Sequence, residues 1–302
     1  MKMRYEIRTD LALEAREGYQ EAAESLRGVS VEEDYDEQRE IRTTRVRIES
    51  ENGAKAMGKE QGLYVTIEAV NLSQPDEGIH REVSEKLAQC LKDMHVFHEK
   101  SSVLVVGLGN EKITPDALGP YVVRNLHITR HIIREYGTSG LDGKMTFELS
   151  GLIPGVSAQT GMESLEIIQG VVRETQPELV IVVDALAARS TRRLSRTIQV
   201  TDTGIHPGSG VGNYRQGINE KSLGVPVIGI GIPTVVDAAT IVHDAMVHVM
   251  EPLNEKEREA FLGETITPQL RTMFVTPKDV DETVKRLSFT ISEGIHLALQ
   301  HE

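Results

Sequence analysis

The feature of this sequence that most constrains its fold is a series of continuous apolar runs, separated by helical segments, between residues 103 and 249. The runs at 103–106 and 179–183 contain only Val, Leu and Ile, which is typical of strands covered on both faces. Strands separated by helices favour right-handed crossovers and a mostly parallel sheet. The sequence therefore predicts an α/β fold, a three-layer sandwich with a mostly parallel central sheet. Further strands are expected at 146–149, 197–200 and 225–230, and helices at 120–134, 163–175 and 235–250.

The two ends of the chain differ in pattern from this core. Apolar residues alternate with others at 63–69, which predicts a half-exposed strand, and 45–49 is a candidate partner for it. A helix is expected at 279–299, on the outside of the core. The 302 residues allow one large domain or two small ones, and we favour one. Its parts are a small N-terminal β/α addition at 11–100, a core at 101–250 and a C-terminal helical part at 251–302.

Charge and hydropathy exclude several classes of partner. The chain has 33 basic and 46 acidic residues, a net charge of −13, which argues against nucleic-acid binding. A small basic cluster stands out at Arg189, Arg192, Arg193 and Arg196. No run of 18 apolar residues and no secretory signal occur, so we expect a cytoplasmic protein without a membrane partner.

Cys90 is the only cysteine of the chain. A single thiol excludes an intrachain disulfide and a multi-cysteine metal cage. Cys90 belongs to an apolar stripe of helical spacing within 79–96, so the pattern favours a packed thiol over a catalytic one.

Two aspartates are expected at the carboxyl ends of the buried strands, where ligands bind in open parallel sheets. Asp116 follows the first strand by a glycine-rich turn, and Asp184 follows the apolar run at 179–183. Asp116 taken alone also fits a turn or a helix cap, and Asp184 fits a buried aspartate with satisfied hydrogen bonds. Two carboxyl groups that share a desolvated site do not both ionise easily, so together they form a candidate acid–base pair for adding water to a carbonyl.

Other motifs compete weakly with this pair. The tripeptide DTG at 202–204 occurs in pepsin-like proteases, but only once here and in an α/β context. The glycine-rich stretch HPGSGVGN at 206–213 lacks the Gly-Lys-Ser/Thr ending of a P-loop, and we interpret His206 as a loop hydrogen-bonding residue. The G-x-S-x-G and H-E-x-x-H motifs are also missing, so the motifs predict no nucleotide cofactor and no zincin-type metal site.

Four segments, GLGNEKITPDALGP, VVDALAARS, TDTGIHPGSGVGN and VPVIGIGIPTVVDA, together resemble the spore germination protease family. The resemblance implies an atypical aspartic endopeptidase, without a cofactor, that degrades small acid-soluble spore proteins in the spore core during germination. It implies a fold similar to that of hydrogenase-maturation proteases, and a homotetramer. The essential aspartates of the family correspond to Asp116 and Asp184.

The same resemblance implies a zymogen that removes its own N-terminal propeptide. The segment IRTDLALEA matches the processing site, which makes 1–10 the propeptide and places cleavage between Asp10 and Leu11. The family cuts after an acidic residue. As a hypothesis, an arginine among Arg189, Arg192 and Arg193 pairs with that acidic side chain, and His206 is a further candidate for substrate binding.

Two alternatives stay open at this point. The first is a metal-dependent, maturation-type endopeptidase in which the two aspartates and His206 hold the metal. The second is a module that binds acidic peptides without cutting them.

Overall fold

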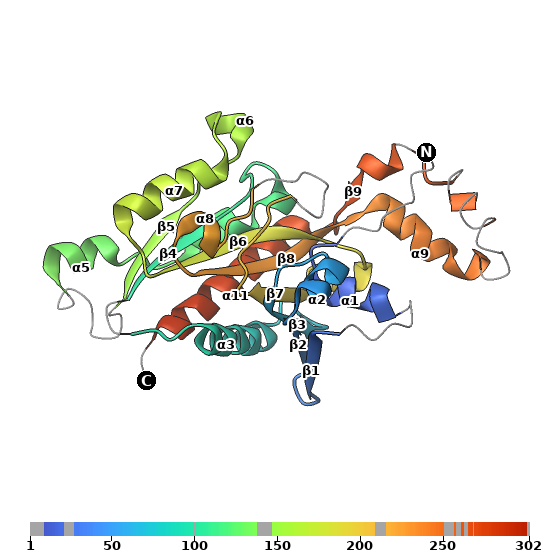
Figure 1. Ribbon diagram of the computed structural model, residues 1–302, viewed down its shortest axis with the longest axis horizontal. Coiled ribbons are helices and arrows are strands. Elements are labelled where there is room, and N and C mark those ends of the chain that lie inside the picture. The colour runs from blue at the N-terminus through green and yellow to red at the C-terminus, as the bar shows by residue number, and fades with distance from the viewer. Residues whose placement is uncertain are drawn as a thin grey trace.

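The computed structural model describes residues 9–20, 27–98, 101–137, 147–208, 216–250, 257, 261–262, 265–267 and 269–300. In this part of the chain, nine strands form one sheet in the order β1-β2-β3-β7-β8-β6-β4-β5, with β9 paired to β8 (Figure 1). The strands are β1 (Val29–Asp36), β2 (Ile41–Ile48), β3 (Gly62–Ala69), β4 (Ser102–Gly107), β5 (Glu148–Leu152), β6 (Leu179–Ala188), β7 (Thr197–Thr201), β8 (Val227–Asp237) and β9 (Phe274–Val275).

Helices connect or cover these strands. The α-helices are α1 (Ala12–Gln20), α2 (Glu51–Met57), α3 (Glu77–Met94), α4 (Leu118–Asn125), α5 (Arg130–Tyr136), α6 (Ser157–Thr160), α7 (Ser164–Thr175), α8 (Glu220–Leu223), α9 (Ala238–Met250) and α11 (Val280–Leu299). Short 3-10 helices are η1 (Thr114–Asp116), η3 (Thr191–Arg193) and η5 (Leu270–Thr272).

The sheet is mixed, so the prediction of a mostly parallel sheet is wrong. The pairs β5–β4, β4–β6 and β6–β8 are parallel, as the helical crossovers between them require. The pairs β1–β2, β2–β3, β3–β7, β7–β8 and β8–β9 are antiparallel. Antiparallel pairing has two sources: β7 and β9 run antiparallel to β8, and the N-terminal addition extends the sheet from β7 instead of standing apart from it. Strand β3 joins the core by pairing with β7. On its other edge β3 pairs with β2, which contains most of the predicted partner segment at 45–49.

Both faces of the central strands are buried, which explains their continuous apolar runs. Val103 and Val105 of β4 belong to one apolar cluster, which includes residues of α3, α4 and α11. Leu104 and Val106 belong to another, which includes residues of α7. Alternate residues of one strand therefore pack on opposite faces of the sheet.

One helix prediction needs correction. The segment expected as one helix at 120–134 forms α4 and α5, because the chain between them is diverted to β5. There the Thr129 hydroxyl accepts a hydrogen bond from the Leu149 N–H (2.9 Å) and donates one to the Phe147 carbonyl. The C-terminal helix α11 packs one largely buried side against α3 and α4, and its Phe289 is 62% exposed. It lies beside α3 (Figure 1), so close that a Cβ on Gly294 would be 2.7 Å from the Leu87 side chain.

Several expected features fall partly or wholly outside the described residues. They are residues 1–8 of the predicted propeptide, Thr146 at the start of a predicted strand, 209–213 of the glycine-rich stretch and part of 251–274. The strand predicted at 146–149 is found as β5, and the helix predicted at 235–250 begins only at Ala238, because β8 continues to Asp237.

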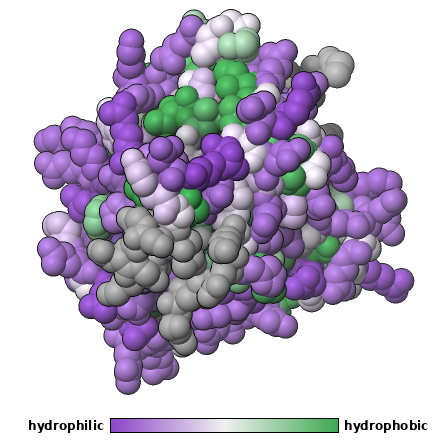
Figure 2. All heavy atoms as spheres, turned by 90° about the vertical axis from the view of Figure 1, so that its left-hand side faces the viewer, coloured by the Kyte–Doolittle hydropathy of each residue, from purple (hydrophilic) through white to green (hydrophobic). Residues whose placement is uncertain are grey.

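The surface at the β5 side of the molecule is mostly hydrophilic, with apolar side chains gathered in its upper part (Figure 2). Among the described helices, none combines the length and the apolar composition that crossing a membrane requires.

Candidate active site

The site forms where β6 extends beyond the end of β4. The last residue of β4, Gly107, pairs with Val183, and the Leu108 N–H still donates to the Val183 carbonyl (2.8 Å). β6 then continues to Ala188 because its other edge stays paired with β8, across a register shift at residues 186 and 187. Asp184 is therefore inside a strand, opposite Gly231, and not at a strand end as the apolar run predicted. Its side chain lies just beyond the point where β4 stops.

Burial and hydrogen bonding fix Asp184. The residue is 7% exposed, and its Oδ1 accepts a hydrogen bond from the Ala185 N–H (2.9 Å). An aspartate in the middle of a buried strand needs such partners, because leaving a carboxylate unsolvated and unpaired costs several kcal/mol.

Asp116 is held by the turn that follows β4. It ends the 3-10 helix η1, and its Oδ2 accepts a hydrogen bond from the Asn110 N–H (2.6 Å). The turn is tight: Gly109 has φ +113°, and a Cβ there would lie 1.9 Å from the Asp116 carbonyl oxygen. The Thr234 hydroxyl ties the turn to β8 by donating to the Pro115 carbonyl (2.7 Å). The glycine-rich sequence thus serves to place one carboxylate.

Asp116 and Asp184 line the same cavity, whose volume is about 410 Å³. Apolar side chains from several elements form much of its wall, so water is partly excluded around the two carboxyl groups. Asp10, the residue before the predicted cleavage point, lines the cavity as well. The wall includes Leu108, Ile113, Pro115, Val156, Leu186, Pro207, Val235 and Phe274.

The backbone and the side chain of Asp10 both bind to β6. The Asp10 N–H donates to the Ala187 carbonyl (3.1 Å), and the Ala187 N–H donates to the Asp10 carboxylate (2.9 Å). Leu11 is fully buried against Leu186, Ala188 and Val236. The predicted cleavage point thus lies where the chain passes the cavity of the two aspartates.

Two side chains that the sequence analysis missed contact the carbonyl oxygen of Asp10. The Lys59 ammonium donates to it at 2.8 Å and the Gln199 amide at 3.1 Å. Burial lowers the pKa of Lys59 below its ordinary value of 10.5, while the nearby carboxylates of Asp10 and Glu14 oppose this shift. The sequence could have indicated Gln199, because a polar residue inside a buried strand is unusual. Lys59 lies in a turn after α2, and no sequence pattern marks it.

The arginines proposed for substrate binding are not among the described residues that line the cavity. Arg193 ion-pairs with Glu17 (2.6 Å) and Glu68 (2.8 Å) and lies 3.5 Å from Glu14. Arg189 contributes its backbone N–H to the Glu14 carboxylate (2.7 Å), and Arg192 is exposed. The Arg193 side chain therefore anchors α1 to the sheet.

His206 is next to the cavity but is not among the described residues that line it. Its Nε2 is 3.4 Å from the Glu60 carboxylate, while the next two residues, Pro207 and Gly208, line the cavity. Oδ1 of Asp202, in the DTG tripeptide, accepts a hydrogen bond from the Leu63 N–H (2.8 Å). Within the described part of the chain, no group of three or more His, Cys, Asp or Glu side chains is arranged to hold a metal ion.

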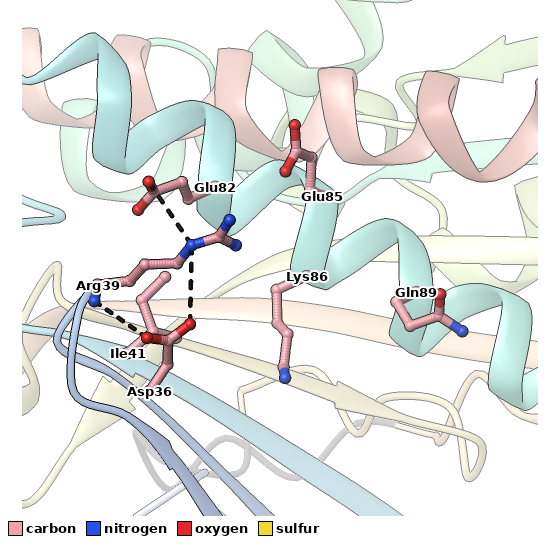
Figure 3. Close-up of a pocket in the computed structure, with 7 residues that line it drawn as sticks. All are labelled: Asp36, Arg39, Ile41, Glu82, Glu85, Lys86 and Gln89. Carbon is pink, nitrogen blue, oxygen red and sulfur yellow. Dashed lines mark hydrogen bonds and ion pairs between the residues drawn. The ribbon is translucent and has the colours of Figure 1, made fainter.

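A second, smaller cavity of about 180 Å³ lies between the β1–β2 hairpin and α3 (Figure 3). Charged side chains form most of its wall, and Arg39 is 3.7 Å from Asp36 and 3.8 Å from Glu82. Neither Asp116 nor Asp184 contributes to its wall, so the candidate acid–base pair is not part of this cavity.

The comparisons with known proteins agree on one family. The model of the germination proteases matches residues 6–259. A germination protease from Caldanaerobacter subterraneus subsp. tengcongensis is 46% identical, over 97% of this chain and 94% of the relative. Relatives with the same name from Clostridium perfringens and Priestia megaterium are 41% and 36% identical. Their alignments cover 98% and 99% of this chain, and 96% and 95% of the relatives.

Proposed function

The chain belongs to the germination protease family, and from this premise we infer that it is a self-processing endopeptidase that hydrolyses small acid-soluble spore proteins during germination. Membership supports a germination endopeptidase; the substrates, the mechanism and the self-processing are our proposal. The observation that carries the proposal is that Asp10, Asp116 and Asp184 line one cavity. The proposal takes the peptide bond after Asp10 as the first bond that the two carboxyl groups cleave.

The proposed mechanism uses the two aspartates as an acid–base pair. One carboxylate removes a proton from a water molecule, whose oxygen attacks the carbonyl carbon of the residue in the Asp10 position. The other, protonated, carboxyl group gives its proton to the departing amine nitrogen of the next residue. The apolar wall supports this division, because two neighbouring carboxylates in a desolvated site share a proton instead of both ionising.

The preference for an acidic residue before the cleaved bond has a candidate cause in β6. The Asp10 carboxylate accepts the Ala187 N–H, a charge-assisted hydrogen bond that an apolar side chain would not form. We therefore propose the Ala187 amide, instead of an arginine, as a contact for the acidic side chain. A Glu in the same position has one more methylene with which to reach this amide.

The decisive experiment separates the two aspartates from a control. Full-length wild-type protein and the variants Asp116→Asn, Asp184→Asn and Asp202→Asn are purified and incubated, and the N-terminus is read by mass spectrometry. We expect wild type and Asp202→Asn to lose residues 1–10, and the other two variants to keep them. Each protein is then mixed with a small acid-soluble spore protein, and cuts after Glu are expected only from the first two. Wild-type processing by Asp116→Asn or Asp184→Asn would disprove the mechanism.

Two further expectations belong to the same proposal. We propose a homotetramer in the spore core, which sedimentation of the purified protein and fractionation of spores would test. We also propose that the helices and sheet are arranged as in the hydrogenase-maturation proteases, with three layers around the parallel strands β5, β4, β6 and β8. Superposition on a structure of such a protease tests this last point.

A further inference from the structure

We propose that Lys59 and Gln199 are catalytic residues that bind the carbonyl oxygen of the cleaved peptide bond and stabilise the negative charge that develops on it. The inference rests on the proposed function, because it takes the bond after Asp10 as the first substrate. It is carried by two donors on one acceptor: Lys59 Nζ at 2.8 Å and Gln199 Nε2 at 3.1 Å from the Asp10 carbonyl oxygen. Both are hydrogen-bond distances to the ground-state carbonyl oxygen, the atom on which the oxyanion would form.

The orientation of the Gln199 amide is fixed by the next peptide unit of the chain, the one between Leu11 and Ala12. Its Oε1 accepts the Ala12 N–H at 2.7 Å, which leaves the NH₂ group to face the Asp10 carbonyl. Gln199 is 7% exposed and lies in β7, between its neighbours β3 and β8. A donor that is already held in place needs no reorganisation when the charge appears, and this preorganisation is the main source of electrostatic catalysis.

Lys59 supplies the positive charge. It lies in the turn after α2, and its ammonium also contacts the Thr9 carbonyl at 3.4 Å. Asp10 and Glu14 are the charged groups that act on it, and both favour its protonated form. Burial acts in the opposite direction and lowers its pKa, and the Lys59 residue is only partly exposed. A desolvated cation stabilises a neighbouring anion more strongly than a solvated one does.

The reaction balances with these groups in place. When the water oxygen bonds to the carbonyl carbon of Asp10, the electron pair of the C=O double bond moves to the oxygen. Lys59 and Gln199 stabilise this alkoxide through hydrogen bonds, without losing a proton. The C=O bond then re-forms and the C–N bond to Leu11 breaks, while the protonated aspartate gives its proton to the leaving nitrogen. The aspartates move protons, and the lysine and glutamine bind charge.

A merely structural role is the alternative, in which the two side chains only hold the propeptide segment against the sheet. The two roles differ in what they predict after residues 1–10 have gone. A holding role affects the binding of the segment alone. A role on the carbonyl oxygen persists for every substrate that the processed enzyme cuts, since each substrate places its own carbonyl there.

The test uses the full-length chain with matched variants. Lys59→Met removes the ammonium and keeps most of the stem, and Lys55→Met changes an exposed lysine on α2. Gln199→Glu keeps an acceptor for Ala12 but removes the NH₂ donor, with the exposed Gln89→Glu as its control. We expect Lys59→Met to slow self-cleavage about 100- to 1000-fold, Gln199→Glu to slow it at least tenfold, and the controls to match wild type. Circular dichroism confirms folding of each variant.

Two further measurements distinguish catalysis from holding. Once processing is complete, each enzyme cleaves a peptide with Glu before the cut bond; we expect kcat to fall and KM to stay within threefold. The wild-type rate should also decline at alkaline pH as the ammonium loses its proton. Lys59→Arg, whose guanidinium stays charged, should lack that decline.

The outcomes separate this inference from the proposed function. If wild-type protein never removes residues 1–10, the proposed function fails. If wild type processes itself and Lys59→Met does so at the same rate, only the present inference is overturned. A raised KM with unchanged kcat in both variants also overturns it, because that result describes holding alone.

Discussion

Replacement of Arg193 by Met is expected to destabilise the protein without changing what it cuts. The Arg193 side chain is 13% exposed and pairs with Glu17, Glu68 and the 1%-exposed Glu14. Burial alone would lower the pKa of Arg193, but the Glu17 and Glu68 carboxylates raise it above its ordinary value, so the guanidinium stays charged. Removal of one partner from a fully buried ion pair costs about 3–5 kcal/mol. Glu17 and Glu68 are 45% and 24% exposed and regain water, so we expect a loss of about 2–4 kcal/mol.

Urea unfolding at fixed protein concentration measures this loss. The exposed Arg192→Met is the matched control, and we expect it to lie within about 0.5 kcal/mol of wild type. The same variants test the substrate-binding hypothesis: in each, self-cleavage with Asp10 is compared with self-cleavage of an Asp10→Asn chain. An Arg193→Met protein as stable as wild type would refute the anchoring argument. If only the Arg193→Met protein cleaves the Asp10 and the Asp10→Asn chains at equal rates, Arg193 contacts the acidic side chain of the substrate after all.

Three other changes follow from local geometry. Gly109→Ala should slow self-cleavage at least tenfold, because its Cβ would collide with the Asp116 carbonyl oxygen; Gly170→Ala, on open helix surface, should not. Burial raises the pKa of Cys90 to about 11, so iodoacetamide at pH 8 should leave the native thiol largely unmodified, by mass spectrometry, and activity unchanged. Burial lowers the pKa of His296 below 6.5, so the unfolded state binds more protons and stability should fall as pH drops below that value. His296→Gln should flatten this dependence in urea unfolding between pH 7.5 and 5.5.

The central elements could be predicted from the sequence because their signal is local. Strands that are buried on both faces appear in the sequence as continuous apolar runs. Helix α7 has apolar residues at helical spacing, a pattern that can be recognised without the rest of the chain. The acidic strand β1 has no such signal. Its side chains are mostly exposed, and Asp34 finds its partner 52 residues further along the chain, in Lys86 (3.2 Å).

The candidate site was predictable only in part for the same reason. Asp116 and Asp184 could be selected because each follows an apolar run. Lys59 and Gln199 are 140 residues apart, and what brings them together is the antiparallel pairing of β3 with β7. Propensity and periodicity do not encode which strands become neighbours, so the sequence gives no reason to connect these two residues.

The unequal lengths of β4 and β6 link the fold to the proposed chemistry. Had β4 continued beside β6, its backbone would have covered the edge that carries Ala187, and no peptide could dock there. Because β4 stops at Gly107, that edge binds Asp10 through both backbone groups of Ala187. Under the proposed function, removal of residues 1–10 vacates this edge, and a substrate occupies it as an added strand. Self-processing and substrate cleavage would then be one reaction at one position, first within the chain and later on another protein.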